Sequence, residues 1–139
     1  TFTASTTPAD LVSITVPANT LGTNHDVLEF EQFVTLNPVN QGNSATVRVK
    51  FGSQDVFEFV NSGTTQTYKI HVVIRRTSAT TQQIDAWVDG SSDPAVAYQY
   101  TAGAQTLTSD VDLVVQGVVT LPMGGAPTVT ARGYYLEWK

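Results

Sequence analysis

Apolar residues alternate with polar ones in nearly every segment of this chain, and this period of two constrains the fold more than any other feature. The clearest example is residues 45–52, ATVRVKFG, in which every second residue from Ala45 to Phe51 is apolar. Such alternation places the apolar side chains on one face of an extended strand, whereas a helix needs a period of about 3.6 residues. The sequence therefore predicts β-strands that bury one face.

The strand-like segments number about nine, at a spacing of roughly 8 to 15 residues, and turn-forming residues separate them. No helical segment is long enough to connect parallel strands, so we expect antiparallel pairing. Connections of uneven length and a final strand that reaches Lys139 favour a jelly roll over a simple meander. We therefore predict an all-β fold, an antiparallel β-sandwich of jelly-roll type. It is expected to form one domain over residues 1–139, with an extended N-terminal arm over residues 1–9.

Residues 111–121 depart from the alternation because they are almost continuously apolar. Strands of this kind are typical of the centre of a sheet that is covered on both faces. We therefore expect this segment to be a central strand with both faces buried.

The charge and cysteine content exclude several kinds of partner and chemistry. Seven Lys and Arg residues against twelve Asp and Glu residues give a net charge of −5. This balance offers no general attraction to nucleic acid or to an anionic membrane, so neither partner is expected. No cysteine is present, which excludes disulfides, thiolate nucleophiles and cysteine zinc sites.

No apolar run approaches the length of a membrane-spanning helix, so we expect no membrane insertion. Because the chain starts at Thr1, we expect a processed protein or a fragment of a longer one.

Two histidines are candidates for catalysis. His25 lies beside Asp26 in the stretch VPANTLGTNHDVLEF, residues 16–30, but adjacent residues of an extended chain point to opposite sides. A turn explains Asn24, His25 and Asp26 better, because Asn and Asp accept left-handed backbone. His71 lies alone in a strand, where a packed or hydrogen-bonded role is more common than catalysis. These two histidines also cannot form a zinc site without further ligands.

Glu29 and Glu31 lie on the same face of one expected strand, with Cα atoms about 7 Å apart, a separation that a glycosidase pair could use. Such pairs are more often a solvated face. The sequence contains no nucleophile-elbow, phosphate-loop or dinucleotide motif. We therefore expect no enzyme activity and no cofactor, and polysaccharide hydrolysis by these glutamates is the third-ranked hypothesis.

The turn DGSSDP over residues 89–94 offers oxygen ligands for a hard cation such as calcium. Asp89 and Asp93 would supply the carboxylates. Because the spacing lacks the full EF-hand pattern, this metal site is a minor hypothesis.

Aromatic residues offer a possible sugar-binding surface. Trp87, Tyr98 and Tyr100 could form an exposed platform on which sugar rings stack, with Asp85 as a hydrogen-bond partner. The competing interpretation, which we favour at this point, is that Trp87 caps the core or is buried against another subunit.

Several segments, taken in order, resemble a jelly-roll domain of tailed-bacteriophage virion proteins, found in tail fibres, spikes and head-decorating proteins. The corner PANTLGTN and the strand start VLEF are followed by the gap NQGNS and the basic strand VRVKFG, and RTSATTQQI comes later; these are residues 17–24, 27–30, 40–44, 47–52 and 76–84. The likeness covers about residues 10 to 90. Where such domains usually place Gly after the Asn, this chain has His25 and Asp26, whose role stays open.

The resemblance implies a non-enzymatic structural protein of the virion, a homotrimer that decorates or stabilises the capsid or forms the tip of a tail or head fibre. Its partners would be copies of itself and other capsid or tail proteins. Val73, Val114 and Val118 are candidates for the subunit interface, because they are apolar at outward positions. The alternative is a carbohydrate-binding module that contacts a glycan on the host cell surface.

Overall fold

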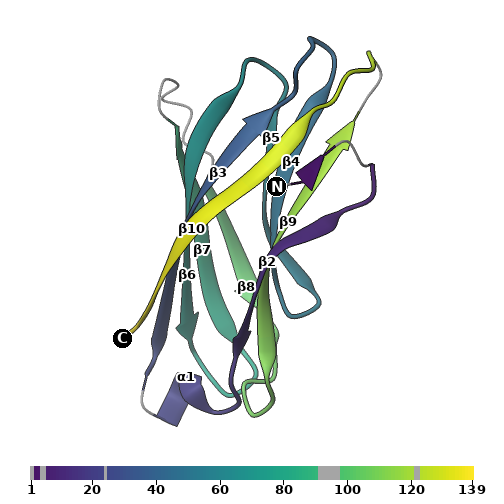
Figure 1. Cartoon of the computed structure of the whole chain (residues 1–139). Helices are drawn as coiled ribbons and strands as arrows, with labels where there is room; N and C mark the ends of the chain where they lie inside the picture. Colours follow the sequence, from purple (N-terminus) through teal and green to yellow (C-terminus); the bar gives the residue numbers. More distant parts are fainter. Residues whose placement is uncertain (1, 4–5, 24, 91–97, 121–122) are drawn as a thin grey trace.

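The chain folds into two antiparallel β-sheets packed face to face, as seen in a computed structural model (Figure 1). The structure describes residues 1–139 except 1, 4–5, 24, 91–97 and 121–122. Sheet A has the strand order β1-β10-β3-β6-β7-β8, and sheet B has the order β2-β9-β4-β5. The strands are β1 (Phe2–Thr3), β2 (Ala9–Val16), β3 (Val27–Asn37), β4 (Ser44–Phe51), β5 (Gln54–Asn61), β6 (Gln66–Arg76), β7 (Gln82–Gly90), β8 (Tyr98–Gly103), β9 (Val111–Thr120) and β10 (Thr128–Trp138). The predicted antiparallel sandwich of about nine strands is confirmed, since only β1 is a short addition.

The pairing combines early strands with late ones at the two ends of the chain. β2 pairs with β9 in sheet B, and β3 pairs with β10 in sheet A, so strands far apart in the sequence are neighbours in both sheets. The middle of the chain pairs locally, with β4 and β5 as a hairpin and β6, β7 and β8 as a meander. Part of the expected N-terminal arm joins sheet A, because Phe2 and Thr3 pair with β10.

The core lies between the sheets and is built from the apolar parity of each strand. In β4, Ala45, Val47, Val49 and Phe51 are fully buried, as the alternation predicts. The inward positions of β3, β6 and β7 are also apolar, and they include Leu28, Phe30, Val34, Leu36, Ile70, Val72, Ile74, Ile84, Ala86 and Val88. Each fully buried side chain of this size contributes about 1.5–3 kcal/mol, so the core is the main source of stability.

β9 occupies the centre of sheet B, between β2 and β4, as predicted. Only one of its faces is buried, however. Leu113 and Val115 have no exposed surface, whereas Val114 and Val118 on the opposite parity are half-buried. The prediction of burial on both faces is therefore wrong, because the outer face of sheet B lies at the surface of the chain.

The corner between β2 and β3 crosses from sheet B to sheet A and contains the four-residue turn α1 (Thr20–Thr23), in which Leu21 and Gly22 have non-helical backbone angles (Figure 1). Gly22 has a φ of 110°, which favours glycine there. The Asp26 backbone N–H donates to Lys139 and its carbonyl accepts from the Arg76 N–H, at 2.9 Å each. The His25 ring lies 6.1 Å from the Trp138 ring. His25 and Asp26 thus join the ends of β3, β6 and β10, which is a structural role.

None of the described residues belongs to a helix long and apolar enough to cross a membrane.

Candidate functional site

The outer face of sheet A carries aromatic and charged side chains that line up across five strands. Strand register places two neighbouring rows on this face. The first row is Tyr135, Glu31, His71, Trp87 and Tyr98, and the second is Glu137, Glu29, Val73, Asp85 and Tyr100. We refer to these residues as the aromatic–acidic face. Neighbours in such a row lie within contact distance, so residues far apart in sequence meet here.

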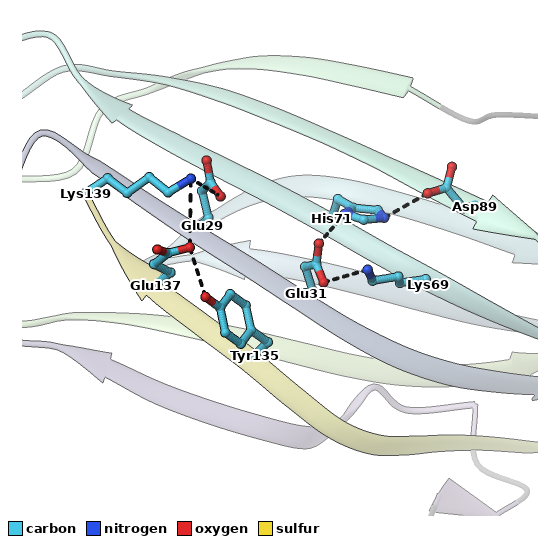
Figure 2. Close-up of polar contacts among 8 residues, drawn as sticks. All are labelled: Glu29, Glu31, Lys69, His71, Asp89, Tyr135, Glu137 and Lys139. Atoms are coloured by element: carbon cyan, nitrogen blue, oxygen red, sulfur yellow. Dashed lines mark hydrogen bonds and ion pairs between the residues drawn. The ribbon is translucent and has the colours of Figure 1, made fainter.

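His71 is the centre of the first row. Its Nδ1 lies 3.1 Å from Glu31 and its Nε2 lies 2.8 Å from Asp89 (Figure 2). The ring stacks on Trp87 with centroids 4.8 Å apart and planes 6° apart, and only 13% of the side chain is exposed. Because carboxylates only accept hydrogen bonds, the ring donates to both partners when it carries both protons. Stacking and these two contacts fix the orientation of His71.

Glu31 is held in its charged form. Lys69 Nζ lies 2.6 Å from Glu31 Oε2 (Figure 2). The hydrogen bond from Lys69, aided by the positive charges of Lys69 and His71, lowers the pKa of the Glu31 carboxyl, although burial opposes this shift. A glycosidase needs one carboxyl with a raised pKa as its general acid. Glu31 therefore does not suit that role.

Glu29, the other half of the candidate hydrolytic pair, belongs to a separate network. Lys139 Nζ lies 3.0 Å from Glu29 and 3.8 Å from Glu137, and the Tyr135 hydroxyl donates to Glu137 at 2.9 Å (Figure 2). This last hydrogen bond raises the pKa of Tyr135, and the hydrogen bond to Glu29 raises the pKa of Lys139. Glu29 and Glu31 share a face as predicted, but each carboxylate is occupied by a cation of its own.

Asp85 organises the second row at β8. It accepts a hydrogen bond from the Tyr98 hydroxyl and another from Arg75 Nη1 at 2.5 Å. The hydrogen bond to Asp85 raises the pKa of the Tyr98 phenol. Tyr100 follows Asp85 in register on the same face. These contacts hold the β8 end of the face in place.

A pocket of about 260 Å³ opens on the aromatic–acidic face. Its lining residues on this face are Glu29, Glu31, His71, Val73, Trp87 and Tyr135, and Phe30 and Val72 of the same strands also border it. Ligand pockets for drug-sized molecules start at roughly 300 Å³, so this one suits a single sugar-sized ring. Aromatic rings stack against the apolar face of a sugar, and carboxylates accept hydrogen bonds from its hydroxyl groups. The arrangement therefore places aromatic and carboxylate residues around one small opening.

The four residues of the predicted sugar platform lie together on the outer face of β7 and β8, as two neighbouring cross-strand pairs. Trp87 pairs with Tyr98, and Asp85 pairs with Tyr100. The tyrosines are exposed, whereas Trp87 is half-buried against His71 rather than in the core. Sequence reasoning missed the other half of the site, above all Tyr135. Only the register of β10 against β3 brings that residue to this face, and no local pattern encodes it.

The residues of the predicted metal site lie only partly within the described ranges. Asp93 lies outside the described residues, and Asp89 is bound to His71. Within the described ranges, no group of three or more His, Cys, Asp or Glu residues could hold a metal ion. The calcium hypothesis therefore stays a prediction about the turn over residues 89–94.

The three valines predicted for a subunit interface lie on opposite outer faces of the sandwich. Val73 is on sheet A, nearly buried between Glu29 and Asp85 in register, whereas Val114 and Val118 are on sheet B. They cannot form one patch on one chain. A ring of subunits could still use both faces, because each interface of a head-to-tail ring joins two different surfaces.

No protein-family model matches this chain, and comparisons with curated proteins and with solved structures also gave no match.

Proposed function

We propose that this chain is a non-enzymatic carbohydrate-binding domain of a bacteriophage particle, and that the aromatic–acidic face is its binding surface. One observation carries the proposal: Trp87 and Tyr135 line the same pocket as Glu29 and Glu31. The location in a virion comes from the sequence motifs alone. Host-surface glycans are the ligands that such a particle would meet.

The charge of the face selects among glycans. Its carboxylates are Glu29, Glu31, Asp85, Asp89 and Glu137, against the cations Lys69, Arg75 and Lys139. The five carboxylates outnumber the three cations, and they still do if His71 is protonated, which disfavours acidic sugars such as sialic or uronic acids. We therefore expect a neutral glycan, bound by ring stacking and by hydrogen bonds from its hydroxyl groups.

The lack of catalysis is also part of the proposal. The lowered pKa of Glu31 leaves it without the proton that a general acid must donate. Glu29 is already bound to Lys139. A Glu29→Gln, Glu31→Gln double variant should show the same background release of sugar from polysaccharide as the native chain. Hydrolysis by the native chain that this double variant lacks would contradict the proposal.

Glycan-array binding with matched tyrosine variants tests the binding site. Tyr135 and Tyr134 are neighbours with almost equal exposure, 53% and 54%, but Tyr134 has the opposite parity and its ring lies 6.0 Å from core Phe30. Tyr135→Ala and Trp87→Ala should each weaken binding by about tenfold or more, as expected for an aromatic anchor. Tyr134→Ala should leave binding within about twofold of the native chain.

Two outcomes would contradict the carbohydrate proposal. The first is that the native chain binds no neutral glycan on the array. The second is that Tyr134→Ala weakens binding as much as Tyr135→Ala, which would show that the tyrosines act through the stability of β10 rather than through the pocket. Circular dichroism of each variant checks that the fold is intact.

Self-association is the second candidate function, and the open outer face of sheet B favours it. Half-buried Val114 and Val118 and exposed Val60 lie in this sheet, a suitable surface for another copy of the chain. A homotrimer that decorates the capsid or forms a fibre tip would cover them. Light scattering at micromolar concentration should then give three times the mass of one chain, and Val118→Lys should reduce it. A single-chain mass would contradict this function and leave glycan binding untouched.

A further inference from the structure

A second pocket lies at the end of the sandwich where three connections meet. It has a volume of about 100 Å³, and its lining includes Asn19, Gly22, Arg76, Leu107 and Thr108. Asn19 and Gly22 come from the corner around α1, Arg76 ends β6, and the other two residues precede β9. The pocket is on the corner whose motif is the most recognisable part of the sequence, and it is separate from the aromatic–acidic face.

Backbone hydrogen bonds fix the wall of this pocket. The Asn19 N–H donates to the Leu107 carbonyl at 2.8 Å, and the Leu107 N–H donates to the Ala79 carbonyl at 2.8 Å. The Gly22 N–H donates to His25 at 2.6 Å. The three connections therefore hold one another, and the pocket is a built feature of the fold rather than a gap between loose loops.

Arg76 supplies a positive charge that no carboxylate among the described residues neutralises. It has the inward parity of β6, so its guanidinium enters the end of the sandwich. Nε is buried and has no hydrogen-bond partner, and no carboxylate of the described residues pairs with this arginine. Its neighbour Arg75 pairs with Asp85 instead. A buried, unpaired N–H of a charged group is costly, so such a group calls for an ordered water or an ion as its partner.

The absence of a side chain at Gly22 leaves the space that the Arg76 guanidinium occupies. A Cβ atom at residue 22 would collide with Nε of Arg76, and the positive φ of 110° also favours glycine. The arginine thus lies flat against the backbone of the corner. Contact with Gly22 limits its freedom to turn toward bulk solvent.

We infer that this pocket binds a small oxyanion, a carboxylate or a phosphate, through the guanidinium of Arg76. Guanidinium groups bind these anions with charge-assisted hydrogen bonds. Asn19 and Thr108 line the same pocket, and both residue types carry side-chain hydrogen-bond donors. The volume exceeds the requirement of one water molecule several-fold, which leaves room for an anion of this size. The inference is independent of the proposed glycan site.

Anion titration of four proteins tests the inference: the native chain, Arg76→Gln, the conservative variant Arg76→Lys and the matched control Arg75→Gln. The probes are acetate and inorganic phosphate, with chloride at equal ionic strength as the reference. For the native chain and Arg75→Gln, we expect a saturable rise in melting temperature with at least one oxyanion, and a saturable shift of the Arg76 Nε–H resonance in nitrogen-15 NMR spectra. Arg76→Gln should lose the melting-temperature response, and Arg76→Lys should keep part of it. Comparison of the acetate titration with the phosphate titration shows which of the two anions the pocket prefers.

Other results would overturn the inference. One is an Arg76 Nε–H resonance that neither oxyanion shifts beyond the effect of chloride, as expected if water alone fills the pocket. Another is an equal response of the native chain and Arg76→Gln, which would place the anion elsewhere. If Arg76→Gln does not fold, the Nε–H titration of the native chain still decides the question.

Discussion

The two outer faces of the sandwich use the same strand alternation but present different surfaces. On sheet A, large side chains form continuous rows, with His71 stacked on Trp87 and bound to two carboxylates. On sheet B, the outward positions of β2 and β9 are mostly Ser, Thr, Val and short polar residues. Its main ion pairs join Arg48 to Glu58 at 2.8 Å and Lys50 to Asp55 at 3.8 Å, all on the hairpin β4–β5. Large, mutually restrained side chains cost little further entropy when a ligand binds, so sheet A is the face suited to recognition.

Removing the central aromatic ring should give the largest difference in stability between the two faces. Trp87→Ala deletes a half-buried ring and its stacking on His71, so the free energy of unfolding should fall by about 2 kcal/mol. The matched change on sheet B, Val114→Ala, removes only a half-buried pair of methyl groups and should cost below about 1 kcal/mol. Urea unfolding measures both. Equal losses would show that the rows of sheet A are not more strongly coupled.

Removing a charged side chain should give a smaller difference in the free energy of unfolding between the two sheets than removing the aromatic ring. His71→Ala removes two contacts to carboxylates and one stacked ring, and it should lower the free energy of unfolding by about 1–2 kcal/mol. Arg48→Ala on sheet B breaks pairs with the exposed carboxylates Glu58 and Asp55 and should cost below about 1 kcal/mol. The same urea series is the measurement. A larger loss for Arg48→Ala would reverse the contrast between the faces.

Acid should affect sheet A through Glu31. The pKa of this carboxyl is lowered from 4.5 mainly by the hydrogen bond from Lys69, so folding favours its charged form. The resulting stability is fully present above the unfolded pKa and is lost as the pH falls through the folded pKa. The effect should stay below about 1 kcal/mol, because the pair is partly exposed. Between about pH 5 and pH 3, Lys69→Met should lose less stability than the native chain. An unchanged pH dependence would show that the pair contributes nothing.

Alkaline titration should give the smallest effect and reports on sheet A alone, since the strands of sheet B contain no tyrosine. The pKa of Tyr98 is raised from 10.0 by the hydrogen bond that it donates to Asp85. Any stability from this bond is present below the unfolded pKa and lost as the pH rises through the folded pKa. In an ultraviolet titration, Asp85→Asn should shift one tyrosine to lower pH, and Tyr98→Phe should remove that transition. Identical curves for Asp85→Asn and the native chain would contradict this assignment.

Part of the candidate site follows from the alternation of residues within each strand, and the rest follows from how the strands pair with one another. Alternation within β7 and β8 predicted that Trp87, Tyr98 and Tyr100 could share a surface. It could not predict that Tyr135 completes the pocket, because the pairing of β10 with β3 spans about a hundred residues of sequence. The neighbours of His71 were missed for the same reason. A local pattern tells which side of a strand a residue faces, but not which strand lies beside it.

The sequence by itself determined that the chain forms an antiparallel β-sandwich and, for the strands that alternate regularly, which residues form its core and which face outward; β9 was the exception. Period-two alternation is a local property, and burial of one face per strand follows directly from it. Tertiary structure alone decided the order of the strands, the rows of the aromatic–acidic face and the meeting of three connections around Arg76. It also decided that the corner with His25 and Asp26 joins β3, β6 and β10. These features depend on contacts between residues distant in the sequence, which only packing of the whole chain selects.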